Sequence, residues 1–260
     1  MEHSFRAAVF DLDGTLLDTL QDLGACADEA LRQYGFPGHT MEEYRSYIGN
    51  GIPKLIARAV PEGTSEEDIQ KVLRFYLGYY PIHCAEHTRF FPGVAETIRL
   101  LRQRGYALAV LSNKTETTAK KIIAEYFPDE PFCLVWGNNG VRPLKPATDA
   151  GYSLLQELTC RPEEVFYLGD GDTDMAFASR MGFFAAGATW GYRPEQALLE
   201  ATDPSRLVTG DMPPTFLWAT AADVKVPAAN TLHMAEALNV PREGHQLLWV
   251  VNFPMFKYDE

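Results

Sequence analysis

Short runs of apolar residues recur along the chain without the polar alternation that marks a half-buried strand. The first run, Ala7–Phe10, leads directly into the polar sequence Asp-Leu-Asp-Gly-Thr. Similar runs lie at Tyr106–Leu111, Phe132–Trp136, Val165–Leu168 and Phe183–Ala186. Continuous apolar runs of this kind are typical of parallel strands that are buried on both faces. The pattern therefore predicts a buried parallel sheet.

Between these runs, apolar residues recur at helical spacing. Val94, Ile98 and Leu101 form one such pattern, which ends at Gly105. Other helices are predicted at Lys120–Tyr126, Tyr152–Leu158 and Asp174–Met181. Strands that alternate with helices indicate an α/β fold with a doubly wound, Rossmann-like parallel sheet. In such sheets ligands bind beyond the carboxyl ends of the strands, so polar residues at those ends are candidates for function.

The segment from about Asp18 to Cys84 breaks this alternation, because its apolar residues keep helical spacing throughout. Thr19 with Asp22, and Thr40 with Glu43, have the form of capping boxes that start helices. We interpret this segment as an inserted α-helical cap domain; the alternative is that its helices merely cover the sheet. The expected division is a catalytic core of residues 1–17 and 85–210, a cap of residues 18–84 and an extension of residues 211–260.

The composition agrees with a globular protein and limits its partners. Of the 260 residues, 46% are hydrophobic, which is ample for a buried core. The first residues contain no apolar run long enough for a signal peptide or a membrane span, so we expect a soluble, cytoplasmic protein. The net charge of -12 argues against nucleic-acid and membrane partners. An acidic protein that binds an anionic substrate needs a local cationic pocket.

The polar sequence after the first strand contains two carboxylates, Asp11 and Asp13. Residues two apart at a strand end can point to the same side, so both are expected to face one ligand. One carboxylate can attack phosphorus, while the other protonates the leaving oxygen and then deprotonates the hydrolytic water. Gly14 allows backbone amides to approach a phosphate closely. An ordinary Asp-Gly turn is the alternative interpretation.

Two later segments offer groups that bind phosphate. Ser112 and Asn113 close the strand Tyr106–Leu111, where a hydroxyl and neighbouring amides suit phosphate oxygens. Lys145 precedes Pro146 on a stiff backbone, so its ammonium group can be aimed at the nucleophile and the phosphoryl group. Taken singly, the first segment also fits ordinary turn chemistry, and the lysine also fits a solvated loop.

A cluster of acidic residues, in the sequence Gly-Asp-Gly-Asp-Thr-Asp, follows the strand Val165–Leu168. Magnesium is typically held by one or two carboxylates together with a substrate phosphate. Asp170 is one predicted ligand, with Asp11 and the backbone carbonyl of Asp13 as others. Clustered acids repel one another, so a cation is their natural partner. Asp172 is interpreted as a solvated turn residue.

These segments, in this order, resemble the haloacid dehalogenase-like hydrolase superfamily. The resemblance implies that Asp11 is the nucleophile, that Asp13 is the general acid and base, and that Lys145 neutralises charge at the nucleophile. It implies a phosphate site of Ser112, Asn113, Gly14 and Thr15, and a Mg²⁺ site of Asp11, Asp13, Asp170 and Asp174. In that site Asp174 either supports the loop from behind or contacts the metal. The helical insert resembles the mobile cap of this superfamily, which closes over the substrate.

Finer details resemble phosphoglycolate phosphatases. The similar segments are Ile48–Ile52, Phe91–Val94, Ser112–Lys114 and Thr189–Tyr192. The resemblance extends from about Phe5 to Ala201. It departs at Leu144 and at Ala147-Thr148, where that family usually has a basic and an acidic residue around the Lys-Pro pair. The departure affects the expected substrate specificity and leaves the expected chemistry unchanged.

The chain continues for about fifty residues beyond the end expected for such a phosphatase, and this length is expected to add structure. Strands are predicted at Phe216–Thr220 and Leu247–Val251, with a helix at Ala228–Leu238 between them. The segment around Asp223 resembles the C-terminal part of α/β-hydrolase esterases, in which such an aspartate orients the catalytic histidine. The chain has no GxSxG elbow and no histidine after the final strand, so we interpret this β-α-β-like extension as a structural remnant or fusion.

Together these features predict a magnesium-dependent phosphatase. Its expected substrate is a small phosphorylated metabolite such as 2-phosphoglycolate, hydrolysed through an aspartyl-phosphate intermediate. The alternatives are a phosphosugar mutase or a pyrophosphatase of the same superfamily, and a catalytically silent binding protein whose tail forms an interface. A homodimer is left open. Arg45, Asn50 and Lys54 of the insert are candidate substrate contacts.

Overall fold

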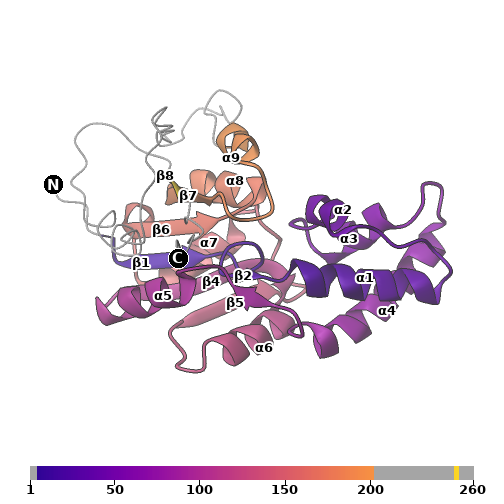
Figure 1. The fold of residues 1–260 in the computed structure, drawn as a ribbon. Coiled ribbons are helices and arrows are strands. Elements are labelled where there is room, and N and C mark those ends of the chain that lie inside the picture. The colour runs from indigo at the N-terminus through magenta and orange to yellow at the C-terminus, as the bar shows by residue number, and fades with distance from the viewer. Residues whose placement is uncertain (1–4, 202–248, 252–260) are drawn as a thin grey trace, which may run out of the picture.

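A parallel sheet forms the centre of the molecule (Figure 1). The computed structural model describes residues 5–201 and 249–251. Six strands lie in the order β5–β4–β1–β6–β7–β8, and every neighbouring pair is parallel. They are β1 (Ala7–Phe10), β4 (Ala107–Thr115), β5 (Leu134–Asn138), β6 (Val165–Gly169), β7 (Phe184–Ala188) and β8 (Trp249–Val251). The strand order reverses beside β1, where doubly wound folds bind their ligands.

Helices cover both faces of this sheet. Ala8 and Phe10 of β1 belong to an apolar cluster with residues of α5 and α6, whereas Ala7 and Val9 belong to a second cluster with residues of α7 and α8. The helices are α5 (Val94–Gln103), α6 (Glu116–Tyr126), α7 (Asp149–Leu158), α8 (Asp172–Met181) and α9 (Glu195–Ala201), and a 3-10 turn (Pro162–Glu164) precedes β6. The predicted α/β fold with a doubly wound parallel sheet is confirmed.

Some boundaries differ from the prediction. β4 extends to Thr115, because the polar segment Ser112–Lys114 is buried and continues the strand. β5 begins at Leu134, since the ring of Phe132 packs edge-on against Phe127, with ring centroids 5.1 Å apart. Helices α6, α7 and α8 begin earlier than predicted, because the residues added at their starts are polar or small and do not mark an apolar face.

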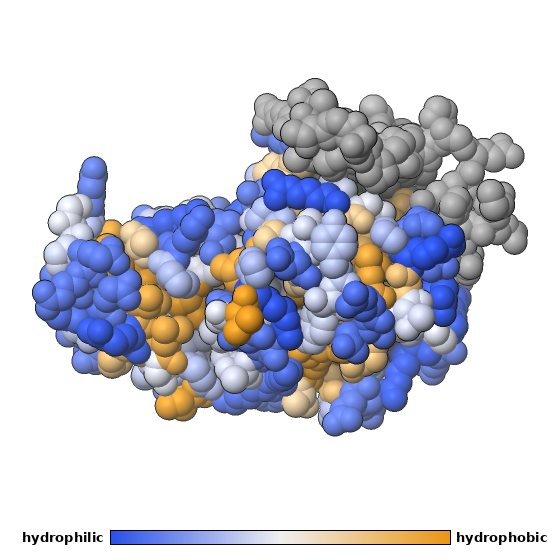
Figure 2. Space-filling model, turned by 180° about the vertical axis from the view of Figure 1, so that it is seen from behind, coloured by the Kyte–Doolittle hydropathy of each residue, from blue (hydrophilic) through white to orange (hydrophobic). Residues whose placement is uncertain are grey.

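The insert after β1 is helical, as predicted. It contains α1 (Leu20–Gln33), α2 (Met41–Tyr47), α3 (Ile52–Ala59) and α4 (Glu66–His83). The buried side chains of Tyr44, Ile56, Val72 and Tyr76 lie within it. These helices stand to one side of the sheet and do not cover its faces (Figure 1). Figure 2 shows them as a lobe beside the core, with a hydrophilic outer end.

Two short strands lead the chain into and out of this insert. β2 (Leu17–Asp18) and β3 (Arg89–Phe90) pair in antiparallel orientation. The buried Asp22 carboxylate of α1 connects the same two segments. It accepts hydrogen bonds from the backbone N–H groups of His87 and Thr88, each at 2.8 Å. It also accepts one from the Thr88 hydroxyl at 2.7 Å. One carboxylate thus ties the entry of the insert to its exit.

The predicted capping box of Thr40 and Glu43 is confirmed at α2, whereas that of Thr19 and Asp22 is wrong. Thr19 precedes α1 but makes no side-chain capping bond. Its hydroxyl donates instead to Asp13 at 2.6 Å, and the Asp22 carboxylate accepts from His87 and Thr88, directly before β3. Both side chains of the expected box therefore have tertiary partners.

Beyond Ala201 the structure describes β8 alone, which pairs in parallel with β7. This confirms a strand within the predicted range Leu247–Val251. The strand and helix predicted between residues 216 and 238, and the esterase-like segment around Asp223, lie outside the described residues. Among the described residues no helix is long and apolar enough to cross a membrane.

We expect Asp22→Ala to lower the free energy of unfolding by about 2–4 kcal/mol, because three donors lose their acceptor and the two on Thr88 are buried. Urea denaturation followed by circular dichroism measures this loss. Asp68→Ala is the control, since Asp68 makes an exposed ion pair with Lys71 whose removal costs about 1 kcal/mol or less. Equal losses in the two variants would contradict the structural role of Asp22.

Candidate active site

Seven of the predicted site residues line one cavity at the carboxyl ends of the strands. They are Asp11, Asp13, Ser112, Asn113, Lys145, Asp170 and Asp174. The cavity has a volume of about 50 Å³, which leaves room for a few water-sized groups. Ile52 and Leu55 of α3 contribute to its wall, so the site lies between the core and the insert. Gly14 and Thr15 do not belong to the lining.

Lys145 holds two of these carboxylates together. Its Nζ lies 2.9 Å from Asp11 Oδ1 and 2.6 Å from Asp174 Oδ1. It also donates to the Leu111 carbonyl at 2.7 Å and contacts the Tyr167 hydroxyl at 3.0 Å. Burial alone would lower the pKa of this lysine, but the two carboxylates raise it. Lys145 is therefore a fixed positive charge beside Asp11.

The carboxylates of Asp11, Asp170 and Asp174 form a buried cluster, with one oxygen of each within 4.8 Å of the others. Burial raises the pKa of Asp11, Lys145 opposes this shift, and the carboxylates of Asp174 and Asp13 add to it, so that the net pKa is about 6. Burial, followed by the carboxylates of Asp11 and Asp174, raises the pKa of Asp170 well above its usual range. Asp11 Oδ1 has no hydrogen-bond partner of normal geometry among the described residues. Buried carboxylates that outnumber the nearby ammonium groups, and a carboxylate oxygen without a hydrogen bond, are features that fit a divalent cation.

Residues around Asp170 fix the direction of its carboxylate. The Thr15 hydroxyl donates to Oδ1 at 3.1 Å, and the Tyr192 backbone N–H donates to Oδ2 at 2.7 Å. A Cβ on Gly14 would lie 2.2 Å from Asp170 Oδ2, and the positive φ of 81° at Gly14 also favours glycine. Gly14 and Thr15 are thus packed around the acid, which explains why the Asp-Gly-Thr sequence is needed there.

Asn113 and Ser112 occupy the end of β4. The Asn113 side chain accepts from the Lys145 N–H at 2.8 Å and donates to the Lys145 carbonyl at 3.2 Å, so it holds the lysine loop against the strand. It also donates to the carbonyl of Gly49 in the insert at 3.2 Å. The Ser112 hydroxyl accepts from the Lys114 N–H at 3.3 Å and lines the cavity.

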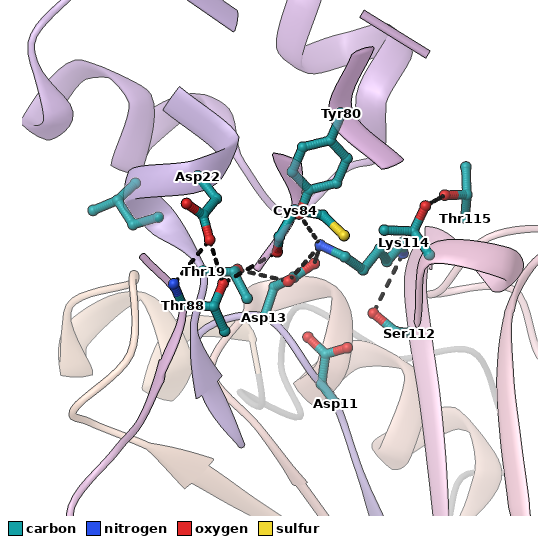
Figure 3. Close-up of polar contacts among 12 residues, drawn as sticks. Asp11, Asp13, Thr19, Asp22, Tyr80, Cys84, Thr88, Ser112, Lys114 and Thr115 are labelled. Carbon is teal, nitrogen blue, oxygen red and sulfur yellow. Dashed lines mark hydrogen bonds and ion pairs between the residues drawn. The ribbon is translucent and has the colours of Figure 1, made fainter. Parts of the chain in front are cut away.

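Asp13 has partners that sequence reasoning missed (Figure 3). Lys114 Nζ donates to its two carboxylate oxygens at 2.8 and 3.2 Å and to the Tyr80 hydroxyl at 2.5 Å. One signal was present: Lys114 follows Ser112 by two positions in a strand, so the two side chains point to the same side. Nothing in the sequence indicated Tyr80, because it lies on α4 far along the chain.

The candidate substrate contacts of the insert are not in this cavity. Arg45 and Asn50 line a larger neighbouring cavity of about 710 Å³, and Lys54 lines neither. Arg193, which was not predicted, lines both cavities. Its guanidinium donates to the backbone carbonyls of Arg45, at 2.7 Å, and Ile48, so a core side chain holds the α2–α3 loop.

Comparison with known proteins agrees with this geometry. The profile of the haloacid dehalogenase-like hydrolase family matches residues 8–188, and the chain belongs to this family. It is therefore an enzyme of the hydrolase class that the sequence predicted.

Similar proteins refine this class. A phosphoglycolate phosphatase of Haemophilus influenzae is 31% identical over 199 residues, which cover 74% of this chain and 89% of the relative. One of Chromobacterium violaceum is 32% identical over 197 residues, with 74% and 89% covered. The crystal structure of a putative phosphoglycolate phosphatase from Lactobacillus delbrueckii superposes with a TM-score of 0.71 at 28% identity and covers 77% of this chain and 92% of that one. The expected class, a phosphoric monoester hydrolase, is confirmed.

The raised pKa of Asp11 predicts a pH-dependent stability in metal-free buffer. A folded pKa of about 6 means that the fold favours the protonated acid, so this contribution is complete below about pH 4 and is lost as the pH rises to about 6. The free energy of unfolding of Asp11→Asn, minus that of the wild type, should therefore rise by about 3 kcal/mol over this range and then stay constant. Urea titrations at a series of pH values measure it; a difference independent of pH would refute the assignment.

Proposed function

We propose that this enzyme is a magnesium-dependent phosphatase that hydrolyses a small phosphate monoester through an aspartyl-phosphate on Asp11. The observation that carries the proposal is the contact of Asp11 with Lys145 in a buried cavity that also contains Asp13 and Asp170. A carboxylate beside a fixed ammonium group is suited to attack an anionic phosphoryl group, because the ammonium offsets the repulsion between the two anions.

In the first step, an Asp11 carboxylate oxygen attacks phosphorus and the bond from phosphorus to the ester oxygen breaks. Asp13, in its acid form, gives its proton to that oxygen, and the alcohol leaves. Lys145 and the Ser112 hydroxyl bind the equatorial phosphoryl oxygens. Asn113 keeps Lys145 in place through the two hydrogen bonds to its peptide group.

In the second step, Asp13 accepts a proton from water as the water oxygen attacks phosphorus. The bond between phosphorus and Asp11 breaks, inorganic phosphate forms, and Asp13 is again an acid. Asp13 thus moves one proton in each direction, and neither step needs an external oxidant or reductant.

The residues that would hold Mg²⁺ are Asp11, Asp170 and the backbone carbonyl of Asp13. When bound, the ion would neutralise the excess of carboxylates and the charge of the phosphoryl group. Asp174 already contacts Lys145 and Tyr167, at 2.6 and 2.7 Å, which supports a role in positioning these groups.

The small cavity and the phosphatase relatives support a small substrate, and the names of those relatives make 2-phosphoglycolate the first to test. Residues 18–84 would act as the cap domain that closes over it, as the contacts of Asn113 and Arg193 with the insert suggest.

Asp11→Asn should abolish phosphate release while leaving the fold intact, because the amide is not a nucleophile. The measurement is release of inorganic phosphate from 2-phosphoglycolate, sugar phosphates, nucleotides and pyrophosphate in Mg²⁺. Isomerisation of a sugar phosphate without hydrolysis would instead indicate a mutase. Substantial turnover by Asp11→Asn would refute the nucleophile.

Mg²⁺ should raise the melting temperature of the wild type, since a cation that binds only the folded state stabilises it by about 2.7 kcal/mol at about 100 times its Kd. Asp170→Asn should lose most of this shift. Asp172→Asn, at the start of α8, is the matched control, because the Asp172 side chain is 56% exposed and the variant should keep the shift. Equal shifts in all three proteins would exclude the proposed site.

A further inference from the structure

Lys114 has no part in the steps above, yet its side chain is only 1% exposed. A buried ammonium group is costly unless it is paired, and its partners here are the Asp13 carboxylate and the Tyr80 hydroxyl. Its Nζ also lies 4.7 Å from the centroid of the Tyr80 ring, a distance at which cation and ring attract. Lys114 therefore connects Asp13 to one residue of the insert.

The partners of Asp13 come from both ends of that insert (Figure 3). Thr19, directly before α1, donates to Asp13 Oδ1 at 2.6 Å. Tyr80 lies near the end of α4, shortly before the chain returns to the core, and reaches Asp13 through Lys114. The direction of the Asp13 carboxylate is thus set by the segments that enter and leave the insert.

Tyr80 is held rigidly within α4. Its side chain is almost fully buried, and its ring stacks on that of Tyr76, with centroids 5.2 Å apart and an angle of 19° between the planes. The hydroxyl cannot follow Lys114 if α4 is displaced. The position of the Lys114 ammonium relative to Asp13 consequently depends on where α4 lies.

We propose that Lys114 is a positioning residue for Asp13 and that Tyr80 couples this positioning to the helical insert. The proposal rests on the proposed function, because it takes Asp13 as the group that moves the proton. With α4 in place, Lys114 and Thr19 direct the Asp13 carboxylate. Displacement of α4 removes the Tyr80 hydroxyl from Lys114 and loosens that arrangement, so proton transfer becomes efficient only with the insert docked.

The test compares Tyr80→Phe with Tyr76→Phe. Each change removes one buried hydroxyl from α4 and keeps the stacked ring, but the Tyr76 hydroxyl has no hydrogen-bond partner among the described residues. On an alkyl phosphate, whose leaving oxygen needs a proton, Tyr80→Phe should lower kcat about tenfold, and Tyr76→Phe should leave it within about twofold. The KM and the inhibition constant of inorganic phosphate should stay unchanged, since Ser112 and Lys145 are intact.

A second readout separates positioning from general damage. The p-nitrophenolate of p-nitrophenyl phosphate is a weak base and leaves without protonation, so its rapid first release should persist in Tyr80→Phe. The following steady state should slow, because activation of water still needs Asp13. Asp13→Asn should show the same pattern, with a loss of about 100- to 10,000-fold. Lys114→Met should show the same pattern as Asp13→Asn, with a smaller loss of steady-state rate. Lys114→Arg should recover part of that rate.

Several outcomes would overturn the inference. Equal kcat values for Tyr80→Phe and Tyr76→Phe would remove the link to the insert. Loss of the first p-nitrophenol release, or weaker binding of inorganic phosphate, would indicate a merely structural role. The proposed function fails separately, if the wild type releases no phosphate or if Asp11→Asn remains active.

Discussion

The contact of Lys145 with Asp11 and Asp174 is the interaction on which the site depends. Two carboxylates share one ammonium group, and Asp170 lies close enough to add a third buried negative charge. The consequence appears in the raised pKa values of Asp11 and Asp170. The site thus carries an imbalance of buried carboxylates over ammonium groups, and perturbed pKa values of this kind are common at functional sites.

The fold maintains this imbalance by placing each group on a different strand end. Asp11 follows β1 and Asp170 follows β6, and these strands are neighbours. Lys145 arrives on the loop after β5 and is bound there by Asn113 from β4 and by the Leu111 carbonyl. The insert adds Thr19, which contacts Asp13 directly, and Tyr80, which contacts it through Lys114. The ammonium contact of Asp11 is therefore made within the core, whereas the contacts of Asp13 involve the insert.

The periodicity of apolar residues was sufficient to predict the parallel sheet, its order of alternation with helices and the helical insert. It also predicted that most candidate site residues lie close together, because the carboxyl ends of parallel strands meet at one edge of the sheet. Gly14 and Thr15 were harder to interpret: their sequence suits a phosphate loop, but in the structure they pack around Asp170. Tyr80 and Arg193 could not be predicted, since their contacts depend on how the insert docks against the core, and local pattern carries no information on that.

The pairing of β8 with β7 has a consequence for how the protein is made. Residues 202–248 separate this strand from α9, so at about 5–20 residues per second the ribosome needs several seconds to deliver the partner of β7. During this interval the outer edge of β7 offers unpaired backbone groups to other nascent chains. The sequence of β7 is Phe-Ala-Ala-Gly-Ala, which contains none of the β-branched residues that favour strands. This weak strand propensity lowers the tendency of the β7 edge to pair with other chains before β8 is made.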